Sequence, residues 1–205
     1  MKKPDYWQQA CRALSRADPV MAGLIRAYPD VALRSRGNAF ETLLRAIVGQ
    51  QISVKAADAV WAKVCAATPV KPEALVALSV DDLRACGLSR MKAGYAIDLA
   101  AHFSEGRIRP RRWARMEDEA IIEELVDVRG IGRWTAEMFL IFHLLRPNVW
   151  PVDDLGLLKA VSLHYRKGEK ITPRQASEIG EAWQPWRTVA TWYLWRSLDP
   201  VAVEY

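Results

Sequence analysis

Cysteine is scarce, and its pattern excludes the common cysteine-based sites. Three cysteines occur, all far apart in the sequence: Cys11, Cys65 and Cys86. Without a Cys-x-x-Cys pair there is no ligand set for a zinc or iron–sulfur site, and we expect reduced, buried thiols. His102, His143 and His164 are also too scattered to form a metal cage, so no required cofactor is predicted.

Long hydrophobic runs and signal segments are absent as well. No apolar run approaches the roughly 20 residues that a membrane-spanning helix needs. The first residues, Met1 to Asp5, carry charges with no apolar core behind them, which predicts a cytoplasmic protein of a bacterial-type cytosol or nucleoid. Hydrophobic residues make up 51% and charged residues 26% of the chain, which excludes disorder and suits a monomer with one compact domain or two small lobes.

Acidic residues are outnumbered by basic ones, and the net charge is +5. A basic protein suits a polyanionic partner, although many basic proteins bind no nucleic acid. Five arginines gather in one short segment: Arg107, Arg109, Arg111, Arg112 and Arg115. We interpret this run as a solvated surface, so charge alone does not identify a partner.

Alternating strand patterns are not found, and the hydrophobic spacing is helical nearly throughout. The segment from Phe40 to Val48 has apolar residues on one helical face. Asn38 and Ser53 are placed to cap this helix and the next, whose apolar face is expected to include Val54 and Val64. Further helix starts are indicated at Ser89 and Thr172-Pro173. The chain is therefore predicted to be all-α, with roughly ten to twelve helices and short connections.

Two helical patterns flank a glycine-rich turn. Residues 119–126 and 133–145 are predicted to be helices, with Arg129-Gly130-Ile131-Gly132 as the turn between them. The glycines permit positive φ and leave no side chain on the surface, while Ile131 can pack into the hairpin. The amide groups that begin the second helix would then face an anion such as a phosphate. Taken alone, the pattern is better explained as a plain end of one helix and start of another.

The turn resembles the helix-hairpin-helix element of the HhH-GPD DNA glycosylase superfamily, whose usual form is Leu-Pro-Gly-x-Gly-x-x-Thr-Ala. Gly130, Gly132, Thr135 and Ala136 are in register, whereas Val128-Arg129 replaces Leu-Pro. The resemblance implies that Gly130, Gly132 and Thr135 bind the DNA backbone. Loss of the proline should loosen the turn, and its arginine replacement could add a phosphate contact. The resemblance also implies a structural Na⁺ or K⁺ ion on the main-chain carbonyls of Val126, Val128 and Ile131.

The same resemblance implies a two-lobed helical fold with a cleft between the lobes. Residues 1–205 would form a single catalytic unit. One lobe is expected to comprise residues 46–145, including the hairpin at 119–145. The other lobe is expected to comprise residues 1–45 and 146–205.

A pair of carboxylates, Asp153 and Asp154, precedes a predicted helix that begins at Leu155. An isolated Asp at such a place is usually a helix cap, and one acid can cap while its neighbour acts. A carboxylate near a helix N-terminus is kept ionised. It can stabilise the oxocarbenium-like sugar of N-glycosidic cleavage and orient or deprotonate water. The essential aspartate of the superfamily aligns with Asp154, so the resemblance implies that Asp154 is the catalytic residue.

A lysine is missing at one decisive position. Superfamily members that also cut the DNA backbone carry a lysine two residues after the second hairpin glycine, where this chain has Trp134. That amine would form a Schiff base with the sugar, so we predict a monofunctional glycosylase without AP-lyase activity. The C-terminal four-cysteine cluster of the endonuclease III-like branch is also absent, which argues against that branch and the related adenine-mismatch branch.

Tryptophan is abundant, with nine residues in the chain. A single Trp is more often a core residue, but an indole face attracts positively charged alkylated purines by roughly 0.5–2 kcal/mol per contact. The segments at 132–136, 153–154 and 183–187 together resemble the 3-methyladenine DNA glycosylase II-like branch, over about residue 40 to the C-terminus. This resemblance implies substrate-binding roles for Trp134, Trp195 and Met138. It also indicates the helical core alone, without the N-terminal β-rich domain of longer members.

The segment from Gly49 to Ser53 matches the superfamily loop that enters the DNA, with Gln51 at the wedge position and Gln50 beside it. Apart from the resemblance, it could equally be a helix end with solvent-facing glutamines. A wedge is needed because glycosylases as a class flip their target base out of the duplex.

These features predict an enzyme that excises alkylated bases such as 3-methyladenine and 7-methylguanine from double-stranded DNA in base excision repair. Three alternatives stay open. The same fold could act on hypoxanthine, uracil or another lesion. The chain could be a non-catalytic DNA lesion-binding protein, or a helical protein-interaction module with a fortuitous Gly-x-Gly turn.

Overall fold

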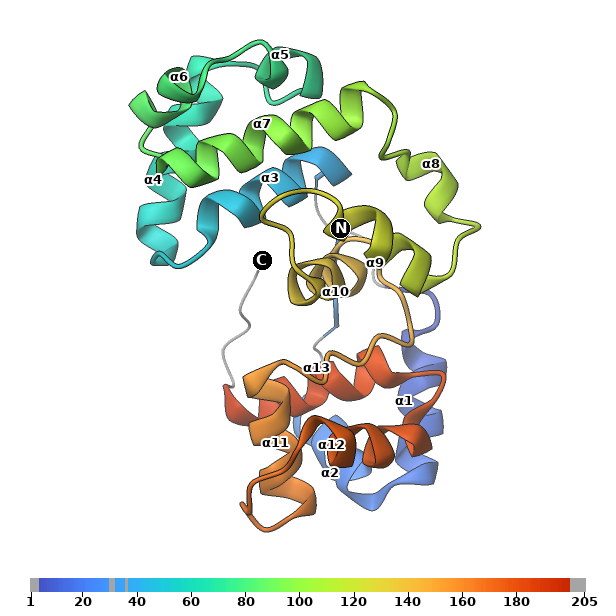
Figure 1. Cartoon of the computed structure of the whole chain (residues 1–205). Coiled ribbons are helices and arrows are strands. Elements are labelled where there is room, and N and C mark those ends of the chain that lie inside the picture. The colour runs from blue at the N-terminus through green and yellow to red at the C-terminus, as the bar shows by residue number, and fades with distance from the viewer. Residues whose placement is uncertain (1–3, 30–31, 36, 200–205) are drawn as a thin grey trace. The chain divides into compact units, whose positions relative to one another are not determined.

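A computed structural model describes residues 4–29, 32–35 and 37–199 of the chain (Figure 1). These residues form thirteen α-helices and one short 3₁₀ helix, with no strand among them. The predicted all-α class is confirmed. The helices are slightly more numerous than predicted, because α5 (Pro72–Val76) and α8 (Pro110–Trp113) are too short to show a helical period. None of the helices in the described ranges is both long and apolar enough to cross a membrane.

The chain divides into two compact units, of which one comprises residues 36–139. Its helices besides α5 and α8 are α3 (Ala39–Gly49), α4 (Val54–Ala67), α6 (Val80–Ala85), α7 (Arg90–Ser104), α9 (Asp118–Val126) and the first turns of α10 (Arg133–Phe142). Helix α7 packs against α3, α5 and α6 and so forms the centre of this unit (Figure 1). It buries Ala93, Ala96, Leu99 and Ala100, whose small side chains allow close approach.

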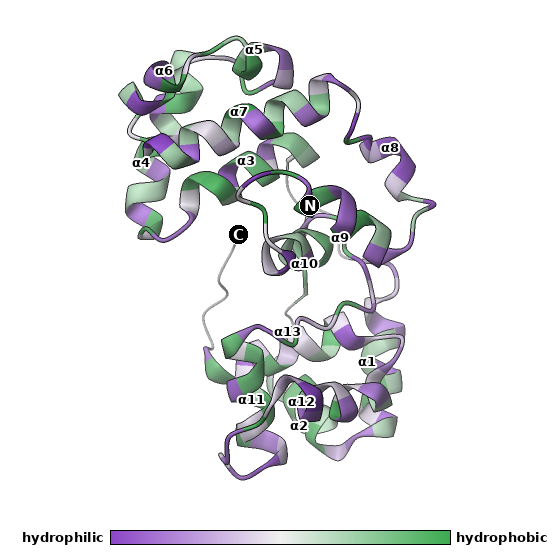
Figure 2. Cartoon of the chain, in the orientation of Figure 1, coloured by the Kyte–Doolittle hydropathy of each residue, from purple (hydrophilic) through white to green (hydrophobic). Residues whose placement is uncertain are grey.

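The other unit comprises residues 1–35 and 140–205. Its helices are α1 (Trp7–Ala17), α2 (Pro19–Ala27), the end of α10, α11 (Leu155–Tyr165), α12 (Pro173–Gly180), the 3₁₀ helix η1 (Glu181–Trp183) and α13 (Arg187–Leu198). Helix α13 packs against α1, α2 and α11, and all residues from Thr188 to Leu194 are buried. The helices of this unit carry both hydrophobic and hydrophilic residues (Figure 2). The lobes expected at 46–145 and at 1–45 plus 146–205 stay a prediction.

Most helix starts follow from local capping. Asn38, Ser53, Ser89 and Thr172 each accept a hydrogen bond from an amide in the first turn of the helix that follows. The expectation that Val54 lies on an apolar face is wrong, because this first-turn residue is 75% exposed. Only farther along α4, at Val64, does the helix meet the core.

Two further expectations need correction, and one is confirmed. Cys65 is exposed, whereas Cys11 and Cys86 are buried as expected, and none of the three forms a disulfide. The second hairpin helix ends at Phe142 rather than at residue 145. It ends there because Leu145 adopts a positive φ of 55° and the Arg146 amide turns back to the Leu140 carbonyl at 2.9 Å.

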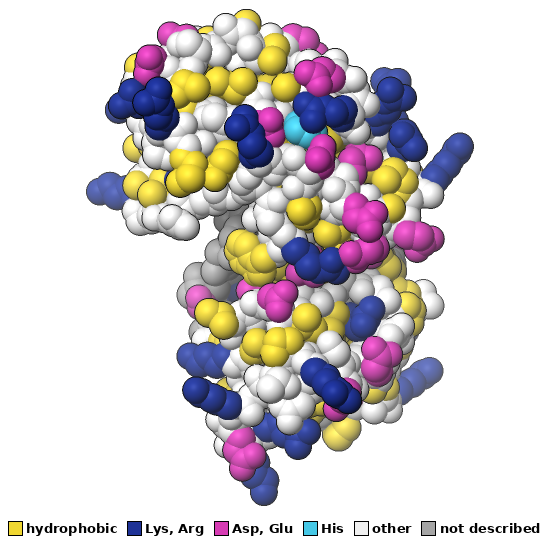
Figure 3. Space-filling view, in the orientation of Figure 1, with side chains coloured by type: hydrophobic (Ala, Val, Ile, Leu, Met, Phe, Trp, Pro, Cys, Tyr) yellow, Lys and Arg dark blue, Asp and Glu magenta, His cyan; other side chains and the backbone are white. Residues whose placement is uncertain are grey.

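The arginine run at residues 107–115 is exposed, as the solvated interpretation predicts. Arg107 pairs with Glu105, and Arg109 donates to the Gly106 carbonyl. Basic and acidic side chains are interspersed over the face drawn in Figure 3, without a large area of one sign.

Candidate functional site

The turn between α9 and α10 uses its two glycines differently. Gly130 has a φ of +87°, a left-handed conformation that side chains rarely adopt. Gly132 has an ordinary φ and open space around its α-carbon, and its carbonyl accepts the Ala136 amide at 3.0 Å at the start of α10. Ile131 is buried, as predicted, and its amide donates to the Val128 carbonyl at 3.1 Å. The prediction of positive φ therefore holds for Gly130 alone.

A second reason for glycine at position 130 lies on α7. A β-carbon at Gly130 would overlap the ring of Tyr95. The Gly130 carbonyl also accepts the side-chain amide of Gln50 at 2.8 Å. Glycine is thus required by backbone conformation and by close packing, of which only the first was visible in the sequence.

The two glutamines of the loop after α3 differ: Gln51 is exposed to solvent, and Gln50 is hydrogen-bonded within the protein. Gln50 is half-buried and donates to Gly130, whereas Gln51 is exposed and has a φ of +57°. The Lys92 ammonium donates to the carbonyls of Val48 and Gln50 at 2.8 and 2.6 Å, and burial lowers the pKa of Lys92. Lys92 was not identified from the sequence, because nothing local to it marks a contact with a loop more than forty residues away.

Arg129 is held by a partner that the sequence did not reveal. Its backbone amide donates to the Asp98 carboxylate at 2.9 Å, and its side-chain Nε lies 3.3 Å from the same carboxylate. The guanidinium therefore has a carboxylate partner within the protein. Asp98 also satisfies an amide that a proline at this position would not have.

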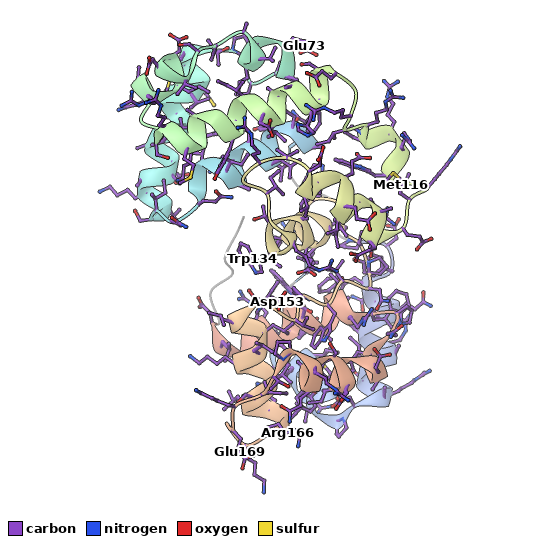
Figure 4. All side chains as sticks on the ribbon, viewed as in Figure 1. Glu73, Met116, Trp134, Asp153, Arg166 and Glu169 are labelled. Atoms are coloured by element: carbon purple, nitrogen blue, oxygen red, sulfur yellow. The ribbon has the colours of Figure 1, made fainter. Side chains whose placement is uncertain are left out.

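The first turns of α10 carry three predicted site residues. Trp134 projects from the helix and is 42% exposed (Figure 4). Thr135 is half-buried, and Met138 is buried one turn later. Arg133 joins the two hairpin helices, since it bonds Glu119 of α9 at 2.6 Å and Glu137 of α10 at 3.1 Å.

The Asp pair before α11 is resolved by its hydrogen bonds. Asp154 is the N-cap of α11, and its Oδ1 accepts the Leu157 amide at 2.6 Å. The same oxygen accepts the indole N–H of Trp195 at 2.9 Å. Asp153 is exposed on the preceding turn (Figure 4). A single residue therefore caps the helix and presents a half-buried carboxylate beside an indole.

Two residues that support this carboxylate were missed. Phe142 stacks on Trp195, with ring centroids 5.8 Å apart and planes 8° from parallel. A β-carbon at Gly156 would lie 3.1 Å from Asp154 Oδ1 and 3.5 Å from the Trp195 ring. Glycine at position 156 thus leaves room for the indole to approach the acid. In the sequence it looked like an ordinary helix residue.

The predicted site residues therefore form two groups, one in each unit. Asp154 and Trp195 come together in the unit of α13, whereas Gln50 and Gly130 come together in the unit of α7. Gln51, Gly132 and Trp134 are exposed in that second unit. Within the described ranges, no cluster of three or more His, Cys, Asp or Glu residues could hold a metal ion.

Known proteins resemble the chain over most of its length. DNA-3-methyladenine glycosylase 1 of Schizosaccharomyces pombe is 34% identical over 163 residues, which cover 77% of this chain and 72% of that protein. The crystal structure of DNA-3-methyladenine glycosidase from Bacillus halodurans has a TM-score of 0.85 at 34% identity, covering 91% of this chain and 87% of that one. A 3-methyladenine DNA glycosylase of S. pombe in complex with abasic DNA has a TM-score of 0.75 at 31% identity, covering 95% of this chain and all of that one.

Relatives also differ in length. The chain spans 45% and 65% of the length of two curated relatives from Bacillus subtilis. A family model described as HhH-GPD superfamily base excision DNA repair protein matches residues 44–185, which include the Gln51 loop, the glycine turn and Asp154. The chain belongs to the HhH-GPD superfamily of base excision DNA repair proteins.

Proposed function

We propose that the protein is a monofunctional DNA glycosylase that excises alkylated bases of the 3-methyladenine and 7-methylguanine type from double-stranded DNA. One observation carries the proposal: the Asp154 carboxylate is held at the N-terminus of α11 by the Leu157 amide and the Trp195 indole. The names of the similar proteins support the same class of substrate. We also propose that the enzyme is a monomer and that it acts in the cytosol or nucleoid, where its DNA substrate lies.

The reaction is hydrolysis of the N-glycosidic bond. An alkylated base carries positive charge, so the bond electrons leave with the base and neutralise it. The sugar is left oxocarbenium-like, and the ionised carboxylate of Asp154 stabilises that charge. Water then attacks the anomeric carbon and loses a proton, with the carboxylate orienting or accepting it. The products are a free base and an abasic site, and no strong general acid is required.

The base itself would be bound by aromatic faces. Trp134 and Trp195 provide indole rings that attract a cationic base by roughly 0.5–2 kcal/mol per contact. Trp134 is exposed, and Trp195 is oriented by its bond to Asp154 and its stacking on Phe142. Met138, buried one turn after Trp134, is the third residue proposed to bind the base.

DNA would be gripped by the glycine turn and propped open by the loop after α3. The amides of Gly130, Gly132 and Thr135 would face phosphate, because the N-terminus of a helix favours an anion. Gln51 would fill the space that the flipped base leaves, with Gln50 anchoring the loop to Gly130. This grip is mostly independent of DNA sequence.

The same turn would hold a structural Na⁺ or K⁺ ion, which would add positive charge near a DNA phosphate. Its proposed ligands are main-chain carbonyls, at Val126, Val128 and Ile131. The Val128 carbonyl accepts one amide, that of Ile131, which leaves its second lone pair for an ion. An ion at this place would contribute positive charge toward a phosphate and no chemistry.

Absence of AP-lyase activity follows from Trp134. An indole cannot form the Schiff base through which an amine cuts the DNA backbone. The chain should therefore leave abasic sites intact. Treatment with hot alkali would then convert these sites into strand breaks.

Asp154→Asn tests the proposal. The asparagine oxygen can still accept the Leu157 amide and the Trp195 N–H, so shape is kept while charge is lost. We expect excision of 7-methylguanine from methylated duplex DNA to fall by about 10²-fold or more, with unchanged affinity for DNA. Asp153→Asn is the matched control and should excise normally.

Each result of this assay has a definite meaning. Near-normal excision by Asp154→Asn contradicts the catalytic assignment. Release of hypoxanthine or uracil in place of 7-methylguanine would support glycosylase activity but contradict the assignment of alkylated bases as the substrate. Binding of abasic DNA without release of any base would identify a lesion-binding protein.

A further inference from the structure

Four residues along one face of α7 contact either the loop after α3 or the segment 127–130, which lie at the two proposed DNA-binding turns of the same unit. Lys92 bonds the carbonyls of Val48 and Gln50, and Tyr95 lies against Gly130. The other two act farther along, as Asp98 bonds Arg129 and His102 lies 3.0 Å from the Asp127 carboxylate. Their spacing of three, three and four residues places them on a single helical face. One rigid helix therefore holds the Gln51 loop and the glycine turn.

Asp98 carries the most demanding of these contacts. Its side chain is only 18% exposed, yet it accepts the Arg129 amide at 2.9 Å and pairs with the Arg129 side chain at 3.3 Å. An unsatisfied amide at this place would pull the turn toward solvent or toward another acceptor. The residue after Arg129 is Gly130, whose left-handed conformation directs the amides that follow.

The negative charge of Asp98, considered by itself, should weaken DNA binding. A carboxylate beside a phosphate-binding turn repels DNA, so its presence weakens binding unless it does something else. The hydrogen bond to the Arg129 amide is that other contribution. The balance between repulsion and positioning decides the sign of any substitution at Asp98.

We propose that Asp98 is a positioning residue for DNA recognition: by satisfying the Arg129 amide, it keeps the glycine turn in its phosphate-binding conformation. The proposal rests on the proposed function, because it assigns the turn to the DNA backbone. Asp98 acts through Arg129 and Gly130 and touches no reacting atom.

Binding of a duplex that contains an abasic analogue tests the proposal, measured by electrophoretic mobility shift at fixed salt and well below each variant's unfolding temperature. Asp98→Ala removes the acceptor and should weaken binding about tenfold, the usual effect of orphaning one amide. Asp98→Asn keeps an oxygen that can accept the amide and should bind at least as tightly as the wild type. Asp81→Ala, at a residue 85% exposed on α6, controls for the loss of one negative charge.

A second background isolates the amide. Proline has no N–H, so in Arg129→Pro the Asp98→Ala change should cause no further loss of affinity. Arg129→Ala keeps the amide and removes the ion pair, and in that background the tenfold loss should persist. In excision assays the loss should appear in KM, with kcat unchanged at saturating DNA.

Two outcomes of the binding measurements overturn the inference. Tighter binding by both Asp98→Ala and Asp98→Asn, as for Asp81→Ala, would show a charge effect alone. Equal losses in the wild-type and Arg129→Pro backgrounds would show that Asp98 acts elsewhere. If Asp98→Ala does not fold, hydrogen exchange of the Arg129 amide is measured in the wild type and in Asp98→Asn. Rapid exchange of this amide in the wild type would refute its hydrogen bond to Asp98. A wild type that neither binds DNA nor releases bases would instead refute the proposed function.

Discussion

Gly130 and Gly132 are two residues apart in one turn, yet they meet different constraints. Gly130 has a left-handed backbone and the Tyr95 ring against its α-carbon, whereas Gly132 has neither. Gly132 is exposed at the start of α10, where a phosphate would approach. The motif thus combines one glycine needed for folding and one that keeps the surface bare.

Alanine at each glycine separates these roles. Gly130→Ala should destabilise the protein by about 2–4 kcal/mol, since strain in φ and overlap with Tyr95 add. Gly132→Ala should change stability by less than about 1 kcal/mol but weaken DNA binding. Urea unfolding and DNA titration measure the two effects. Equal stability of the two variants would contradict the packing described for Tyr95.

Trp195 has two functions that a phenylalanine separates. Trp195→Phe keeps a ring to stack on Phe142 and removes the N–H that Asp154 accepts. Loss of a hydrogen bond to a charged group should lower kcat about tenfold. Trp186→Phe, at a ring stacked on Tyr6, is the control and should leave kcat unchanged. An unaltered kcat in Trp195→Phe would mean that the indole does not orient the acid.

At the scale of elements, Arg133 joins α9 to α10 across the hairpin. Its bond to Glu119 lowers the pKa of that carboxyl below 4.5, and the same bond raises the pKa of Arg133. A carboxyl whose pKa is lower in the folded state stabilises the fold above its unfolded pKa. The contribution disappears as the pH falls through the folded value.

Glu119→Gln should therefore be less stable than the wild type at pH 7, by about 0.5 kcal/mol because the pair is exposed. The difference should shrink as the pH falls below 4.5 and vanish in more acidic solution. Thermal unfolding of both proteins between pH 3 and pH 7 measures it. A difference independent of pH would show that the ion pair is not its source.

Helices and their starts could be predicted because their signals are local. Asn38, Ser53 and Thr172 cap the helices as expected. Contacts between distant segments could not be predicted: Asp98 with Arg129, or Phe142 with Trp195, depends on packing that no short pattern encodes. Within the candidate site, Asp154 and the glycine turn could be predicted from the sequence through the family resemblance. Their supporting residues emerged only in three dimensions.

At the scale of the whole molecule, the net charge is +5, and basic and acidic side chains are interspersed on the face drawn in Figure 3. Affinity for DNA should then come from a few phosphate contacts, chiefly at the glycine turn. With about three such contacts, affinity should fall about 40-fold between 50 and 200 mM salt. Asp154→Asn should show the same salt slope as the wild type. A salt-independent affinity would contradict backbone recognition.

The uneven burial of the nine tryptophans, all within the described ranges, has an optical consequence. Trp134 alone is exposed, whereas Trp7, Trp113 and Trp183 are almost fully buried. Iodide in solution should therefore quench the fluorescence of Trp134 first, and a bound nucleotide should shield it. In the proposed base site, Trp134 would thus report occupancy without any attached dye.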